Sequence, residues 1–136
     1  MSLNENKAIA RQYFEAFVKN DHNWMDKHIS PDFVRNDPGL DFEVRGPEGV
    51  KKLASVLLGA FPDMQLDVAD EVAEGDKVLM RLTLRATHGG EFAGMPATNR
   101  KVEVAVLDLF QLSEGKLVEQ WAMLDNMGLM QQLNEG

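Results

Sequence analysis

The sequence predicts an α+β domain in which three helices are followed by a strongly curved, mostly antiparallel sheet. Up to Pro62, apolar residues recur with the period of about 3.6 that is typical of amphipathic helices. After Pro62 the period changes to two, which indicates strands with one buried face. Short turns such as 113–115 separate the strands and join antiparallel neighbours. Helices that precede such a sheet pack on one of its faces, so we expect them to close an apolar pocket.

The first half of the chain contains three segments with helical spacing and one short extended segment. The predicted helices are residues 4–20, 23–29 and 47–61, and the extended segment is residues 33–37. Pro47 suits the first turn of a helix, and Pro62 cannot continue one. Pro38 and Gly39 end the extended segment.

The second half predicts four strands and a short final helix. The strands are residues 64–69, 78–88, 101–112 and 116–124, and the helix is residues 127–133. In the second of these strands, the even-numbered residues from Val78 to His88 share an apolar face. In the third, Asp108 shares a face with valines, while Leu107 and Leu109 lie on the opposite face. Residues 89–99 contain three glycines and a proline, which predicts a loop.

Composition limits the function classes. All 136 residues fit one domain, 1–136, and the net charge is −8. An acidic surface repels phosphate backbones, so we expect no nucleic-acid partner. No run of 18 apolar residues predicts a membrane span, and the absence of cysteine is compatible with the cytoplasm, where we expect the protein. The three histidines have no metal-ligand spacing, and no nucleotide-binding motif occurs, so we expect neither a metal nor a cofactor.

Acid–base chemistry in an apolar pocket is what these exclusions leave. Asp125 ends the last strand at the same parity as Trp121 and Met123, so an inward Trp121 would also turn Asp125 inward. A carboxylate beside an indole is poorly solvated, which raises its pKa and its basicity. The alternative is that Asp125 caps the final helix.

Other polar residues fall on predicted core faces, each with a structural alternative. Asp108 either pairs with a neighbouring strand or stays protonated and donates to an oxyanion. His88 is either a hydrogen-bonded core residue or a pocket acid. Tyr13 either packs in the core or presents its phenol to the pocket. Asn36 and Asp37 precede Pro38, where simple turn chemistry is the alternative.

Several segments in order along the chain resemble the SnoaL-like polyketide cyclases. These segments are 46–50, 87–102, 115–121 with Asp125 four residues later, and 128–133. The resemblance implies a cone-shaped fold like that of nuclear transport factor 2, often dimeric through the sheet. It also implies cofactor-free intramolecular aldol cyclisation of an aromatic polyketide ester, in which the aspartate at the Asp125 position takes a proton from an activated carbon. Members often have histidine where this chain has Asn36 and Gln120.

A second resemblance is to the ketosteroid isomerases. It implies that Tyr13 matches their oxyanion-hole tyrosine, Asp37 their general base and Asp108 their protonated aspartic acid, which donates a hydrogen bond to the oxyanion. A third hypothesis is a non-enzymatic module that binds small ligands. It follows from the acidic charge and from the two departures at Asn36 and Gln120.

The sequence predicts the following catalytic residues, pocket residues, ligand and partner. The catalytic candidates are Asp125, His88 and Asp37, and the pocket candidates are Tyr13, Phe17, Asn36, Asp108, Trp121 and Met123. The expected ligand is a small apolar or aromatic molecule that contains a carbonyl group. Leu107 and Leu109, on a face that helices leave open, predict a homodimer through the sheet.

Overall fold

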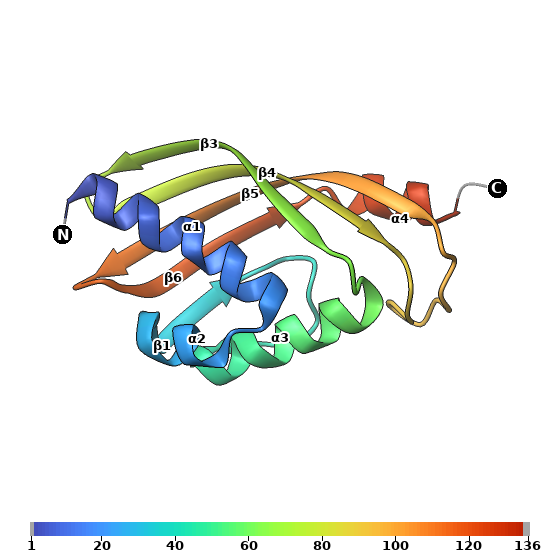
Figure 1. Ribbon diagram of the computed structural model, residues 1–136, viewed down its shortest axis with the longest axis horizontal. Helices are drawn as coiled ribbons and strands as arrows, with labels where there is room; N and C mark the ends of the chain where they lie inside the picture. Colours follow the sequence, from blue (N-terminus) through green and yellow to red (C-terminus); the bar gives the residue numbers. More distant parts are fainter. Residues whose placement is uncertain (1, 135–136) are drawn as a thin grey trace.

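The computed structural model describes residues 2–134, which form four helices and one curved six-stranded sheet (Figure 1). The helices are α1 (Leu3–Lys19), α2 (His22–His28), α3 (Gly46–Ala60) and α4 (Asn126–Asn134). The strands are β1 (Ile29–Asn36), β2 (Val44–Arg45), β3 (Gln65–Glu74), β4 (Lys77–Thr87), β5 (Lys101–Ser113) and β6 (Lys116–Leu124). Their order in the sheet is β2-β1-β6-β5-β4-β3, and only β1 and β6 run parallel among the pairs described. The α+β prediction is therefore confirmed.

Polar residues set the limits of the first two helices. Ser2 and Glu5 form a capping box at the start of α1, and Asn20 ends that helix in the left-handed conformation. Asp21 accepts a hydrogen bond from the Trp24 amide at 3.1 Å, so α2 begins at His22 and not at the predicted Asn23.

The helices α1, α2 and α3 lie on the concave side of the sheet, and α4 lies at the end of β5 and β6 (Figure 1). Tyr13 and Phe14 of α1 pack edge-on against Phe110 of β5, with ring centroids 5.1 and 5.7 Å apart. Aromatic pairs with this geometry stabilise a core beyond the area that they bury. The concave face of the sheet is therefore the one that meets the core and the pocket.

A β-bulge in β6 determines which side chains of this strand face the core. Leu112 pairs with Leu117, but Gln111 pairs with Glu119, so β6 contains one extra residue, Val118. An extra residue moves every later side chain to the opposite face of the sheet. Beyond the bulge, the inward residues are Gln120, Ala122 and Leu124.

The predicted inward orientation of Trp121, Met123 and Asp125 is therefore wrong. Trp121 lies on the convex face opposite Leu109, and the Met123 side chain is 58% exposed. Asp125 is also exposed, and its Oδ1 accepts a hydrogen bond from the Gly128 amide at 2.9 Å. Asp125 therefore caps α4, which was the alternative to its role as a base in the pocket.

The strand β1 alternates in the same way. Phe33 is buried on the concave side, and Arg35 and Asp37 follow it at the same parity into the pocket. Asn36 points to the other side, where its Nδ2 donates to Glu119 Oε2 at 2.9 Å. The prediction that Asn36 lines the pocket is therefore wrong, because strand alternation places it on the convex face.

His88 anchors the loop between β4 and β5. It is fully buried, and its Nδ1 lies 3.0 Å from Thr98 Oγ1 and accepts a hydrogen bond from the Thr98 amide at 3.3 Å. The ring packs against Phe61, with centroids 5.6 Å apart. His88 does not border the pocket, so it occupies the hydrogen-bonded core position that was the alternative to a pocket acid.

The convex face of the sheet carries a partly exposed apolar row. Val72, Leu79, Leu109 and Trp121 stand directly opposite one another across four strands. Leu107 and Met123 form the next pair along β5 and β6.

No helix within residues 2–134 is long and apolar enough to cross a membrane.

We expect this face to bury itself against a second copy of the chain, because an apolar row of this length is costly to leave in water. Light scattering at micromolar concentration should give the mass of a dimer, and Leu107→Glu should give a monomer. Val56→Glu is the matched control, because Val56 is an exposed residue of α3. A monomer mass for the wild type would contradict the prediction.

Candidate functional site

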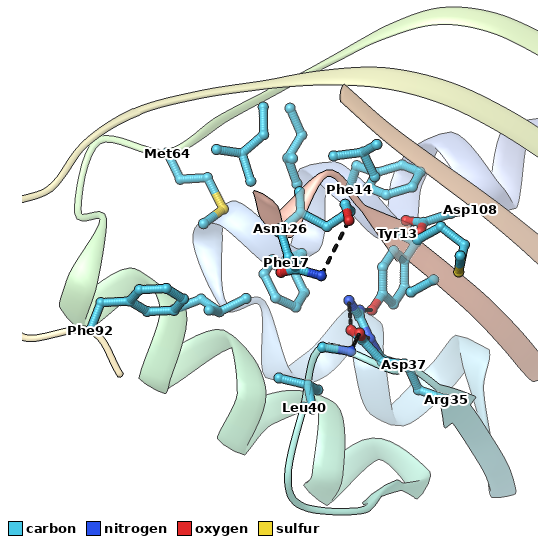
Figure 2. A pocket seen from close by; sticks show the side chains of 18 residues that line it. Tyr13, Phe14, Phe17, Arg35, Asp37, Leu40, Met64, Phe92, Asp108 and Asn126 are labelled. Carbon is cyan, nitrogen blue, oxygen red and sulfur yellow. Dashed lines mark hydrogen bonds and ion pairs between the residues drawn. The ribbon is translucent and has the colours of Figure 1, made fainter. Parts of the chain in front are cut away.

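A cavity lies between the concave face of the sheet and helices α1 and α3. Most of its wall is apolar, and its polar side chains other than Asn126 gather at one end (Figure 2). The apolar lining comes from Phe14, Phe17, Leu40, Leu57, Met64, Leu66, Leu84, Phe92, Val106, Ala122 and Leu124. The polar side chains are Tyr13, Arg35, Asp37, Asp108 and Asn126. An apolar cleft with a few convergent polar groups is the common form of a small-molecule site.

The polar end is organised by Arg35. Its Nε and Nη2 donate to Asp37 Oδ2 at 3.1 and 2.9 Å, and its Nη1 donates to the Tyr13 hydroxyl oxygen at 3.2 Å (Figure 2). The side chains of Arg35 and Asp37 are only 13% and 11% exposed. A buried guanidinium is tolerated when a carboxylate neutralises it, and Asp37 supplies that charge.

Both oxygens of Asp37 are already engaged. Oδ2 accepts from Arg35, and Oδ1 accepts from the Gly39 amide at 2.9 Å. These three hydrogen bonds hold the carboxylate against Arg35 and the Gly39 amide, so neither oxygen is left without a partner. Asp37 is therefore better suited to neutralise Arg35 than to act as a base.

Asp108 is the second carboxyl group of the pocket, and its position on the valine face of β5 is as predicted. It is 3% exposed, and its Oδ1 has no hydrogen-bond partner within residues 2–134. Burial raises its pKa from 3.8 to about 6; Arg35 opposes this shift and Asp37 adds to it. A carboxyl group with this pKa can both accept and return a proton near neutral pH.

Tyr13 offers a hydroxyl proton at the same end. Burial raises the pKa of its phenol, so it stays protonated, and the charge of Arg35 acts against that rise. Burial would lower the pKa of Arg35, but Tyr13, Asp108 and Asp37 together raise it, so the guanidinium stays charged. Because the Tyr13 oxygen accepts from Arg35, its own hydrogen is available to a ligand oxygen.

The cavity is narrow. Its volume is about 90 Å³, whereas typical ligand sites hold about 300–1,000 Å³. Gly39 and Asn126 are exposed members of the lining and mark the mouth. A substrate larger than a single ring must therefore extend through this mouth or displace the side chains that border it.

The potential ligands of a metal ion are dispersed. Within residues 2–134, no three His, Asp or Glu side chains are grouped as a metal ion requires. The two carboxyl groups of the pocket, Asp37 and Asp108, are placed around a guanidinium.

Comparison with known proteins places this chain in a family. Residues 7–133 match the family model of the SnoaL-like polyketide cyclases. The chain belongs to the SnoaL-like polyketide cyclase family. The predicted resemblance is thereby confirmed over almost the whole chain.

The relatives of this SnoaL-like protein are described with different activities. It is 28% identical over 110 residues to DnrD of Streptomyces peucetius, an aklanonic acid methyl ester cyclase, and the match covers 80% of this chain and 73% of DnrD. IdmH of Streptomyces antibioticus, a proposed polyketide cyclase, is 32% identical with a TM-score of 0.85, over 96% of this chain and 99% of IdmH. AclR of Streptomyces galilaeus, a proposed hydroxylase, is 36% identical with a TM-score of 0.83, over 97% of this chain and 82% of AclR.

The pocket of this SnoaL-like protein unites only part of the predicted site. Tyr13, Phe17, Asp37 and Asp108 border the cavity. Met123 also borders it, although this residue is exposed. The remaining predicted residues lie elsewhere, namely Asn36, His88, Trp121 and Asp125.

Two residues were not predicted: Arg35, which borders the cavity at its polar end, and Gln120, which is the neighbour of Arg35 in the sheet and does not border the cavity. Arg35 follows Phe33 and precedes Asp37 at the same parity, so the alternation of β1 could have identified it. Gln120 is fully buried, with no hydrogen-bond partner for either amide atom within the described chain. The bulge at Val118 turns Gln120 inward, and no residue type in β6 predicts that bulge.

The burial of Asp108 predicts a pH-dependent stability. Its pKa in the folded state, about 6, exceeds the value of 3.8 expected in the unfolded chain. Folding therefore favours the protonated form, and the contribution of this form is lost as pH rises from about 4 through about 6. Asp108→Asn has no such dependence. Its free energy of unfolding, relative to the wild type, should increase by up to about 3 kcal/mol between about pH 4 and pH 7.5.

Urea unfolding of both proteins at the two pH values measures this difference. The control is Asp125→Asn, which removes an exposed carboxylate outside the pocket. A difference between Asp108→Asn and the wild type that stays constant with pH would contradict the raised pKa of Asp108.

Proposed function

We propose that this protein abstracts a proton from carbon next to a carbonyl group of an apolar substrate and so promotes an intramolecular aldol cyclisation. In this proposal Asp108 is the base and Tyr13 is the donor to the enolate oxygen. The observation that carries it is a carboxyl group buried beside a buried tyrosine at the polar end of an apolar cavity, where burial raises the pKa of that carboxyl group to about 6. Asp125 has no part in it, because that residue is exposed and caps α4.

The electrostatics favour Asp108 over Asp37 as the base. The charges of Arg35 and Asp37 cancel, so ionised Asp108 gives the pocket one net negative charge. When Asp108 takes the proton, the negative charge moves to the enolate and the net charge does not change. A reaction that conserves the net charge of a buried site avoids the cost of creating a new charge there.

The steps of the reaction balance in protons and electrons. The carboxylate of Asp108 removes the α-proton, and the electrons of the C–H bond form an enolate whose oxygen accepts a hydrogen bond from Tyr13. The enolate carbon then attacks a second carbonyl carbon of the same substrate and forms a C–C bond. The resulting alkoxide takes the proton back from Asp108. Each such acid–base role is worth about 10²–10⁴ in rate.

The relatives support the choice of substrate for a first assay. DnrD and DauD of Streptomyces are both named as aklanonic acid methyl ester cyclases and are 28% identical to this chain. Aklanonic acid methyl ester is therefore the probe with the best prior support. AclR, at 36% identity, is described in terms of a different reaction, so turnover itself must be measured.

Cyclisation of this ester in deuterated water tests the proposal. The wild type should form the cyclised product, and Asp108→Asn should lose about 10²–10⁴ of kcat because the base is gone. Tyr13→Phe should lose about 10²–10³ because one donor to the oxyanion is gone. The pH–rate profile should fall on its acid side near pH 6, where Asp108 becomes protonated.

Asp125→Asn is the matched control, because it changes a carboxylate outside the pocket and should keep full activity. Loss of activity in Asp125→Asn with none in Asp108→Asn would reverse the assignment. No cyclisation by the wild type would remove this ester as substrate, and the absence of α-deuteration as well would remove the reaction class.

A second candidate function is double-bond isomerisation with Asp37 as base. It is favoured by the convergence of Tyr13, Asp37 and Asp108 on one cavity. The probe is a β,γ-unsaturated 3-ketosteroid, whose conversion to the conjugated enone is followed by ultraviolet absorbance. If Asp37 is the base, Asp37→Ala should lose about 10²-fold or more in rate. No conversion by the wild type, or an equal rate in Asp37→Ala, ends this candidate.

A further inference from the structure

Gln120 is a polar side chain in a place where an apolar one would pack. It is fully buried on the concave face of β6, and neither Nε2 nor Oε1 has a hydrogen-bond partner within residues 2–134. Buried amide groups are nearly always hydrogen-bonded, because an unpaired one loses its hydrogen bonds to water and gains none from the protein. A leucine of similar size would avoid this cost, so the amide requires an explanation outside packing.

The strand register places Gln120 beneath Tyr13. Its direct neighbour on β1 is Arg35, and its direct neighbour on β5 is Phe110. Both neighbours contact Tyr13, Arg35 through the hydrogen bond of 3.2 Å and Phe110 through ring packing at 5.1 Å. The amide of Gln120 therefore lies in the row of side chains that the Tyr13 ring covers.

The same register places Gln120 diagonal to Asp108. Asp108 pairs directly with Ala122, two residues along β6 from Gln120 and on the same face. A diagonal pair in an antiparallel sheet lies within reach of a long side chain, and Ala122 has no side chain long enough to separate the two. Although neither contact has the geometry of a full hydrogen bond, the Gln120 amide is close enough to lower the pKa of Asp108 and of Tyr13.

The backbone at Gln120 is fixed from the convex side. Asn36 Nδ2 donates to the Gln120 carbonyl oxygen at 3.2 Å and to Glu119 Oε2 at 2.9 Å. This pair of bonds ties the end of β1 to β6 beside the amide. Gln120 itself does not border the cavity.

We infer that Gln120 is a positioning residue whose amide, held between Tyr13 and Asp108, orients the Asp108 carboxylate toward the cavity. This inference rests on the proposed role of Asp108. The other charged or titratable groups that face Asp108 are Arg35 and Asp37 from the β1 side and Tyr13 from α1. Of the groups around Asp108, Gln120 supplies a neutral side-chain donor, which steadies the carboxylate without forming an ion pair with it.

Carboxyl ¹³C NMR titration of the whole protein tests this inference without any substrate. In Gln120→Leu the pKa of Asp108 should rise by about one unit, because a polar contact that favours the charged form is lost. The matched control is Gln131→Leu, which removes an exposed amide from α4 and should leave this pKa unchanged. If Gln120→Leu does not fold, Gln120→Met gives the same measurement with a more flexible side chain.

An unchanged pKa of Asp108 in a folded Gln120 variant overturns the inference and leaves Gln120 a structural residue. Once turnover has been measured, the acid side of the pH–rate profile should move to higher pH by the same amount in Gln120→Leu. Failure of the proposed function is recognised separately: the wild type would then show no turnover, while the NMR titration of Asp108 could still be measured.

Discussion

One extra residue in β6 decides what the pocket contains. Val118 is inserted between the pairs Leu112–Leu117 and Gln111–Glu119, and the strand alternates regularly beyond it. The insertion turns Gln120 and Ala122 toward the helices and leaves Trp121 on the convex face. The same residue therefore defines the neighbours of Asp108 inside the sheet and the apolar row outside it. Both the candidate site and the candidate interface depend on this one irregularity.

The polar end of the cavity is organised by a balance of charge. A buried guanidinium and two buried carboxyl groups would be strongly destabilising in an apolar cavity unless their charges were matched. Arg35 and Asp37 satisfy each other, while Asp108 remains a carboxyl group whose ionisation burial opposes. Such a group destabilises the fold at neutral pH and is useful for proton transfer. Locally unfavourable residues of this kind concentrate at functional sites.

Much of the fold follows from periodicity, and the orientation of β6 does not. The limits of β6 were predicted at Lys116 and Leu124, and the buried face of β4 from Val78 to His88 was correct, because alternation is strong in both. Asp108 was placed correctly because β5 is regular through it. Asp125 was placed wrongly because a bulge has no sequence marker when the inserted residue is an ordinary valine. The two-residue strand β2 is too short to show any period.

The orientation of β6 is open to a direct chemical measurement, because the chain has no cysteine. Single-cysteine variants Ala122→Cys and Asp125→Cys, made with Leu107→Glu so that the convex face stays uncovered, can be labelled with a bulky maleimide. We expect Asp125→Cys to react at the rate of a free thiol and Ala122→Cys to react only after unfolding. Rapid labelling of Ala122→Cys with protection of Asp125→Cys would contradict the bulge, the position of Asp108 beside Gln120 and the site built on both.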